Sequence, residues 1–86
     1  MSFEVIFDSV AVDFLNSLEK PIKERIYKKI MSTVDNPMHF FERLEGRKDY
    51  KLRIGDYRAI ADISFDKKRI EITLIGHRKN VYQQLP

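Results

Sequence analysis

The stretch from Tyr50 to Ser64, YKLRIGDYRAIADIS, decides the fold. Its first five residues alternate between apolar and basic side chains, which is the period of a strand with one buried face. Gly55 and Asp56 follow as a tight turn, and Tyr57 begins a second strand-like run. We therefore predict a β-hairpin over residues 50–64.

A third strand is predicted after the next turn. Ile70, Ile72 and Leu74 occupy every second position, and Gly76 closes the run. A short basic and aromatic tail, residues 77–86, follows. The second half of the chain therefore predicts three consecutive strands and a tail.

The first half of the chain predicts one strand and two helices. Phe3, Val5 and Phe7 alternate with other residues as in a short opening strand. Two apolar stripes at helical spacing then follow. Pro21 is predicted to lie at the start of the second helix, where proline is tolerated because the amide hydrogen that it lacks would be unpaired there. The stripes consist of Val10, Ala11, Phe14, Leu15 and Leu18, and of Ile22, Ile26, Ile30 and Val34. Residues 35–37, Asp-Asn-Pro, are predicted to end the second helix.

The order strand, helix, helix, strand, strand, strand predicts an α+β fold. The helical hairpin should pack on one face of a mostly antiparallel sheet. With 86 residues and no repeat or linker, the chain is expected to form a single domain, residues 1–86. No apolar run approaches the roughly 20 residues of a membrane span, and the start lacks the features of a signal peptide. A cytoplasmic protein without membrane contact is expected.

The positive charge of the chain gathers in its second half. Residues 1–41 hold five Lys/Arg and six Asp/Glu, whereas residues 42–86 hold eleven and seven. In the predicted hairpin, Lys51 and Arg53 share one strand face, Arg58 lies just past the turn from them, and Arg78 lies just past the end of the third strand. If the strands pair in sequence order, these four cations converge on the face opposite the helices. Such a cluster indicates either a bound polyanion or an ordinary solvated basic face.

The sequence lacks the motifs of several enzyme classes. It contains no cysteine, and its two histidines, His39 and His77, lie far apart. There is no HExxH, no glycine-rich phosphate loop and no nucleophile elbow. No metal site and no cofactor are therefore expected. His39 is interpreted as a surface residue, and Arg25 as part of a helix face turned away from the sheet.

The chain resembles the RelE/ParE toxin superfamily of bacterial and archaeal toxin–antitoxin pairs. The resemblance extends over nearly the whole chain and rests mainly on three strings: LEG at 44–46, YKLRIGDYR at 50–58 and IGHRKNVY at 75–82. Similarity to RelE implies an endoribonuclease that cuts messenger RNA in the decoding site of the ribosome. It also implies a RelB-like antitoxin as partner, in a toxin–antitoxin hetero-oligomer.

The resemblance also implies the site residues. The catalytic set would be Lys51, Arg58, Arg78 and Tyr82, with His77 as a further proton donor, and the substrate-binding set would be Arg53 and Lys79. A 2′-hydroxyl would attack the adjacent phosphate, leaving a 2′,3′-cyclic phosphate and a 5′-hydroxyl. Arg53 stands where the family pattern has a lysine, and a guanidinium is a poor base, so phosphate binding is its expected role.

Each of the other residues would have a separate task. Lys51 would be the general base, since neighbouring cations favour the neutral amine. Arg58 would stabilise charge on the pentacoordinate phosphorus, and Arg78 would act at the leaving 5′-oxygen. Tyr82 would stack on a base, unless it only anchors the tail to the sheet.

The sequence is also compatible with two other functions. ParE toxins share the fold and poison DNA gyrase, but they generally lack the full basic and tyrosine set. A noncatalytic RNA-binding module would use the same basic face without any reactive geometry. The presence of Lys51, Arg58, Arg78 and Tyr82 together favours the ribonuclease.

Overall fold

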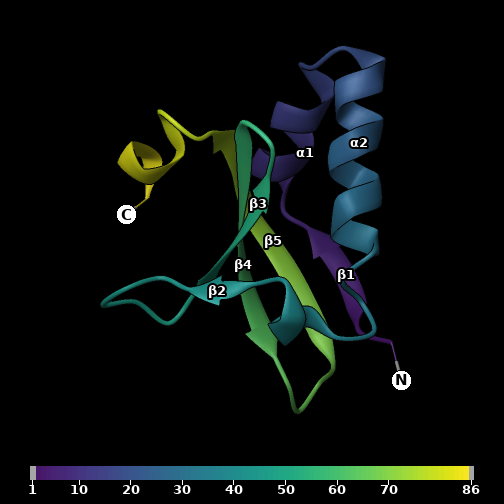
Figure 1. Ribbon diagram of the computed structural model, residues 1–86, viewed down its shortest axis with the longest axis vertical. Helices are drawn as coiled ribbons and strands as arrows, with labels where there is room; N and C mark the ends of the chain where they lie inside the picture. The colour runs from purple at the N-terminus through teal and green to yellow at the C-terminus, as the bar shows by residue number, and fades with distance from the viewer. Residues whose placement is uncertain (1, 86) are drawn as a thin grey trace.

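The computed structural model describes residues 2–85, which form a sheet with two helices packed on one of its faces (Figure 1). The elements in chain order are β1 (Glu4–Phe7), α1 (Ser9–Asn16), α2 (Lys20–Met31), the 3-10 helix η1 (Pro37–His39), β2 (Glu42–Arg43), β3 (Tyr50–Ile54), β4 (Tyr57–Ser64), β5 (Arg69–His77) and the 3-10 helix η2 (Val81–Gln84). In space the strands follow the order β1-β5-β4-β3-β2. The predicted α+β architecture is confirmed.

The direction of each strand follows from its connection. The β2–β3, β3–β4 and β4–β5 pairs are antiparallel and joined by turns or a short loop, whereas β1 runs parallel to β5. The helical hairpin of α1 and α2 leads the chain away from β1 and covers one face of the sheet. The sheet is therefore mostly antiparallel, as predicted.

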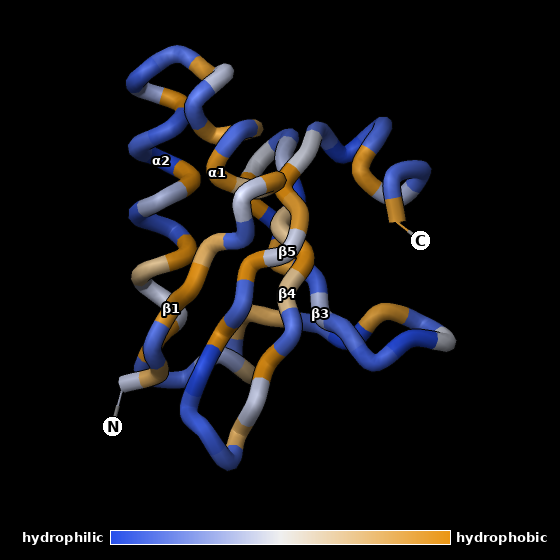
Figure 2. The backbone as a smooth tube through the Cα atoms, turned by 180° about the vertical axis from the view of Figure 1, so that it is seen from behind, coloured by the Kyte–Doolittle hydropathy of each residue, from blue (hydrophilic) through white to orange (hydrophobic). Residues whose placement is uncertain are grey.

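The main core lies between this helical hairpin and the sheet. Ala11 and Leu15 are the buried residues of α1, and Ile26 and Ile30 are those of α2. They pack with residues at every second position of the strands, among them Leu52. Figure 2 shows the resulting alternation of hydrophobic and hydrophilic segments along α2 and the strands. Most residues of the two predicted stripes are therefore buried or partly buried, but Val10 is 56% exposed and Val34 lies beyond the end of α2.

A second, smaller cluster lies on the opposite face of the sheet, here called the open face. It consists of Ile60, Leu74 and Val81, with Leu44 and Leu85 packed against it. Val81 belongs to η2, so this cluster fastens the C-terminal tail to the sheet. The docking positions the tail beside the residues predicted to carry chemistry.

Two local features differ from the sequence-based prediction. Strand β2 was not predicted, because two residues at a sheet edge show no hydrophobic period. Helix α2 ends at Met31 rather than near residue 35. The hydroxyls of Ser32 and Thr33 donate hydrogen bonds to the carbonyls of Lys29 and Ile30, which satisfies acceptors at the helix end.

Within residues 2–85 no helix is both long and apolar enough to cross a membrane.

Candidate functional site

Three predicted cations meet on the open face, and we call Lys51, Arg53 and Arg58 the basic cluster. Lys51 and Arg53 alternate with buried residues along β3, so both point away from the core. Arg58 of β4 is the direct cross-strand partner of Arg53. Partners of this kind have Cβ atoms about 5 Å apart and side chains on the same face. The strand register therefore sets like charges side by side, as predicted.

Arg58 is the buried member of the basic cluster, with 7% of its surface exposed. Its Nη1 atom donates to the carbonyls of Gly55 and Tyr57, each at 2.7 Å. Within residues 2–85 it forms no ion pair with a carboxylate, and its Nη2 and Nε atoms have no hydrogen-bond acceptor. A buried cation without a counter-charge is costly unless an anion binds to it.

Arg78 and Lys79 follow the last residue of β5. The backbone N–H of Arg78 donates to the carbonyl of Asp56 at 2.8 Å, and its Nε lies 3.8 Å from the Asp56 carboxylate. This contact brings the end of β5 to the β3–β4 turn, next to Arg58. The side chain of Lys79 is exposed. Arg78 therefore lies near the basic cluster, as predicted.

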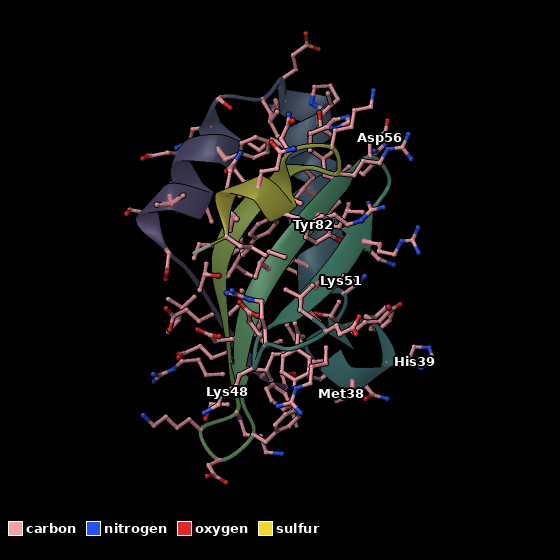
Figure 3. The ribbon with its side chains drawn as sticks, turned by 90° about the vertical axis from the view of Figure 1, so that its left-hand side faces the viewer. Met38, His39, Lys48, Lys51, Asp56 and Tyr82 are labelled. Atoms are coloured by element: carbon pink, nitrogen blue, oxygen red, sulfur yellow. The ribbon has the colours of Figure 1, made fainter. Side chains whose placement is uncertain are left out.

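Tyr82 of η2 lies over the open face. The Lys51 ammonium is 6.0 Å from the centre of its ring, and Figure 3 shows the two side chains next to each other. Tyr82 remains 41% exposed. It therefore has the surface needed to stack on a base, close to a cation that can bind the neighbouring phosphate.

His77 lies on the other face of the sheet. Its ring packs edge-on against Tyr57 at 5.7 Å, and Tyr57 in turn contacts Phe14 of α1. The backbone N–H of Lys79 donates to Nδ1 of His77 at 3.2 Å. Successive residues of a strand point to opposite faces, so proximity to Arg78 in the sequence does not bring His77 to the basic cluster.

Glu42 is a candidate that the sequence interpretation missed. It is the cross-strand partner of Lys51, so its carboxylate rises from the same face of the sheet. The sequence shows only an acidic residue at this position. Glu42 reaches Lys51 only because the short strand β2 pairs with β3. A carboxylate beside Lys51 adds a second proton acceptor to the site.

A groove of about 1120 Å³ lies on the open face, and its lining does not include the residues of the basic cluster. One wall is the loop between β2 and β3, residues 44–49, and the other includes Gln84 and Leu85 of the tail. Leu74 contributes to its floor. Leu74 pairs with Ile60, which pairs with Lys51 in the next strand, so the floor of the groove at Leu74 lies two strands from that cation, while Arg43 on the groove lining belongs to β2, the strand next to it.

The loop that forms one wall is held by a bidentate ion pair. Nε and Nη2 of Arg47 donate to the two carboxylate oxygens of Asp49, each at 2.9 Å. This hydrogen bonding lowers the pKa of the nearly buried Asp49 below its ordinary value, although burial opposes the shift. The pair fixes the conformation of the loop.

The Arg47–Asp49 pair predicts a pH dependence of stability. A lowered carboxyl pKa stabilises the folded state above the unfolded pKa of about 4, and the stabilisation is lost as the pH falls through the folded pKa. We expect Asp49→Asn to be less stable than the wild type at pH 7, with the difference shrinking below about pH 4. Urea unfolding of both proteins from pH 7 to pH 2 measures this. A difference that stays constant over that range would contradict it.

The open face carries acidic residues away from the basic cluster. Asp62 of β4 pairs with Glu71 of β5. The pKa of Glu71 is raised by a hydrogen bond with Asp8 and by the charges of Asp8 and Asp62. A polyanion is therefore attracted to the end of the open face near the β3–β4 turn, where the basic cluster lies, and repelled from the region of Asp62 and Glu71.

Comparison with known proteins yields one family and a group of similar structures. The model of the family described as ParE toxin of type II toxin–antitoxin system, parDE, matches residues 5–82. That range includes the whole basic cluster, Arg78 and Tyr82. None of the curated protein sequences compared with the chain matches it significantly.

Several solved toxin–antitoxin structures share the fold. The archaeal RelE–RelB complex from Pyrococcus horikoshii is 28% identical, with a TM-score of 0.77 over 91% of this chain and 97% of that one. The RelBE2 complex from Mycobacterium tuberculosis is 21% identical, with a TM-score of 0.80 over 91% of this chain and 100% of that one. The intact RelBE complex from E. coli is 22% identical, with a TM-score of 0.73 over 88% and 96%.

Proposed function

The chain belongs to the ParE toxin family of type II toxin–antitoxin systems, and on that basis we propose that this toxin is a ribosome-dependent endoribonuclease that cuts messenger RNA. The observation that carries the proposal is Arg58, a buried cation with no carboxylate partner within residues 2–85. Arg53 stands directly opposite it, and Lys51 lies two residues away on the same face. A phosphodiester supplies the missing negative charge.

The reaction needs neither metal nor cofactor. A ribose 2′-hydroxyl attacks the adjacent phosphorus, and the bond from phosphorus to the 5′-oxygen of the next nucleotide breaks. The products are a 2′,3′-cyclic phosphate and a 5′-hydroxyl. The chain has to accept one proton, stabilise the charged phosphorus and stabilise the leaving oxygen.

The described side chains can perform these tasks. Lys51, or Glu42 opposite it, takes the proton of the 2′-hydroxyl. Arg58 binds the nonbridging oxygens through its Nη2 and Nε atoms, and Arg53 binds a phosphate beside it. Arg78 stabilises the leaving 5′-oxygen, which takes its proton from solvent. His77 has no part, because it lies on the other face of the sheet.

The groove and Tyr82 provide for the rest of the substrate. Tyr82 stacks on a base next to Lys51, which orients the nucleotide without selecting one sequence. The groove has room for the RNA strand to continue between the tail and the loop of residues 44–49, where Arg43, Arg47 and Lys48 on the lining offset the charge of Asp62. Because few groups here act as acids or bases, the ribosome is needed to hold the RNA in the reactive geometry.

The proposed protein partner is a cognate RelB-like antitoxin in a hetero-oligomer. Relatives of the same fold were solved as RelE–RelB and RelBE complexes. An acidic segment that folds on binding would complement the basic cluster and cover its surface.

The test is primer extension on translating ribosomes, with naked RNA and a gyrase supercoiling assay in parallel. We expect cuts in ribosome-bound messenger RNA, little cutting of naked RNA and normal supercoiling. Intact messenger RNA together with inhibited gyrase would contradict the proposal and support the second candidate below. If the protein neither cuts messenger RNA nor inhibits gyrase, the proposal is also contradicted, and a noncatalytic RNA-binding module is the remaining function.

Inhibition of DNA gyrase is the second candidate, and one observation favours it. The matching family model is that of ParE, and ParE toxins act on gyrase. The full set of Lys51, Arg58, Arg78 and Tyr82 supports the ribonuclease instead, because gyrase inhibition requires no phosphate site on the open face.

A further inference from the structure

Two arginines of the proposed site are bound to the same two-residue turn. Arg58 donates from Nη1 to the carbonyl of Gly55 at 2.7 Å. Arg78 donates from its backbone to the carbonyl of Asp56 at 2.8 Å, and its Nε is 3.8 Å from the Asp56 carboxylate. The turn thus contacts the cation assigned to the phosphorus and the cation assigned to the leaving oxygen.

The backbone conformation of the turn requires glycine at its first residue. Gly55 has a φ of +58°, in the left-handed region that other residues rarely adopt. A Cβ atom at this position would also lie 2.7 Å from Nη2 of Arg25, which reaches the turn from α2. The backbone strain of any other residue would displace the Gly55 carbonyl that holds Arg58, whereas the end of the flexible Arg25 side chain can move aside. The expectation that Arg25 lies away from the sheet is wrong, because its long side chain spans the distance from the helix to the turn.

The bonds to the turn leave the reactive edges of the arginines available. Arg58 uses Nη1 for the turn and keeps Nη2 and Nε, the edge that binds a phosphate in bidentate fashion. Arg78 is held near Asp56 by an exposed and long ion pair. Its Nη1 and Nη2 atoms form no hydrogen bond within residues 2–85, so they can contact the phosphate while Nε stays beside Asp56.

We propose that the Gly55–Asp56 turn is the positioning element of the site, with Asp56 as the positioning residue for Arg78. This inference rests on the proposed ribonuclease function. The turn fixes the separation of the two arginines before the RNA arrives. Since the attacked phosphorus and the leaving oxygen are bonded neighbours, that separation affects the transition state more than substrate binding.

Asp56→Ala tests the carboxylate, with Asp66→Ala as its matched control. Asp66 lies in the β4–β5 turn, and its replacement changes the net charge by the same amount. On translating ribosomes we expect Asp56→Ala to lower kcat about 10-fold with little change in KM, because displacements near 1 Å can cost about 100-fold. Asp56→Asn, which keeps an oxygen acceptor, should recover most of kcat. Equal kcat values for the Asp56→Ala and Asp66→Ala proteins would overturn the proposal.

Gly55→Ala tests the second contact. It should lower kcat at least 10-fold, because alanine is strained at this positive φ and the turn that holds Arg58 would shift. The double variant Gly55→Ala/Arg25→Ala should recover little of the loss, because the flexible Arg25 side chain can move away from an alanine unaided. Circular dichroism establishes that each variant folds. Wild-type kcat in Gly55→Ala would overturn the proposal.

A second readout separates this inference from the ribonuclease function. The order parameter of the Arg78 Nε–Hε group, measured by NMR without RNA, should fall in Asp56→Ala and stay unchanged in Asp66→Ala. An inactive wild type would contradict the ribonuclease function, and the order parameter would still test the positioning role. Equal order parameters in both variants would overturn that role.

Discussion

Replacing Arg58 with methionine should abolish toxicity while leaving the protein at least as stable as the wild type. Methionine keeps most of the side-chain volume and removes the charge. Loss of a preorganised donor to the transition state typically costs about 10²–10³-fold in kcat. The charge is buried without a carboxylate partner within residues 2–85, so its removal should leave the midpoint of thermal unfolding unchanged or raise it.

Primer extension on ribosomes and thermal unfolding by circular dichroism measure the two effects. Lys67→Ala is the control, because this exposed cation lies in the β4–β5 turn at the other end of the sheet. It should change neither activity nor stability. If Arg58→Met lowers activity and the unfolding midpoint together, Arg58 is a structural residue and the phosphate site is misplaced.

The hydrophobic period was sufficient to predict the layers of the fold. The alternation in residues 50–54 placed Lys51 and Arg53 on one face, and the register with β4 then set Arg58 opposite Arg53. The apolar stripes likewise identified the buried faces of both helices. These features depend on spacing within one element, which a sequence displays directly.

Features that depend on contacts between elements were not predictable in the same way. Glu42 becomes relevant only because the two-residue strand β2 pairs with β3. Arg25 lies in a helix, and its contact with Gly55 depends on how α2 packs against the hairpin. His77 stands next to Arg78 in the sequence, yet the strand pleat turns it toward Tyr57 on the other face.

Tyr82 is the catalytic candidate whose position depends most on packing outside the main core. Val81, the residue before it, is fully buried against Ile60 and Leu74. The Val81 side chain also fills the space next to Gly76, where a Cβ atom would lie 3.2 Å from Val81 Cβ. Burial of Val81 therefore holds the Tyr82 ring over Lys51.

We expect Val81→Asp to release the tail and to cost as much activity as Tyr82→Ala. A carboxylate cannot be buried in this apolar cluster, so η2 should leave the sheet while the main core between the helices and the strands persists. Stacking on a base contributes about 1–3 kcal/mol, so each variant should lose about 5- to 150-fold in kcat/KM on ribosomes. The double variant should lose no more than either single one, because both remove the same contact.

Val12→Asp is the matched control, since Val12 is exposed on α1 and the substitution changes the charge equally. It should retain wild-type cleavage, which shows that an added negative charge alone does not inhibit. Additive losses in the double variant would mean that Val81 acts independently of Tyr82, through Ile60 and the strand that carries Arg58. Non-additive losses with an intact circular dichroism spectrum would identify the tail as the support that presents Tyr82 to the RNA.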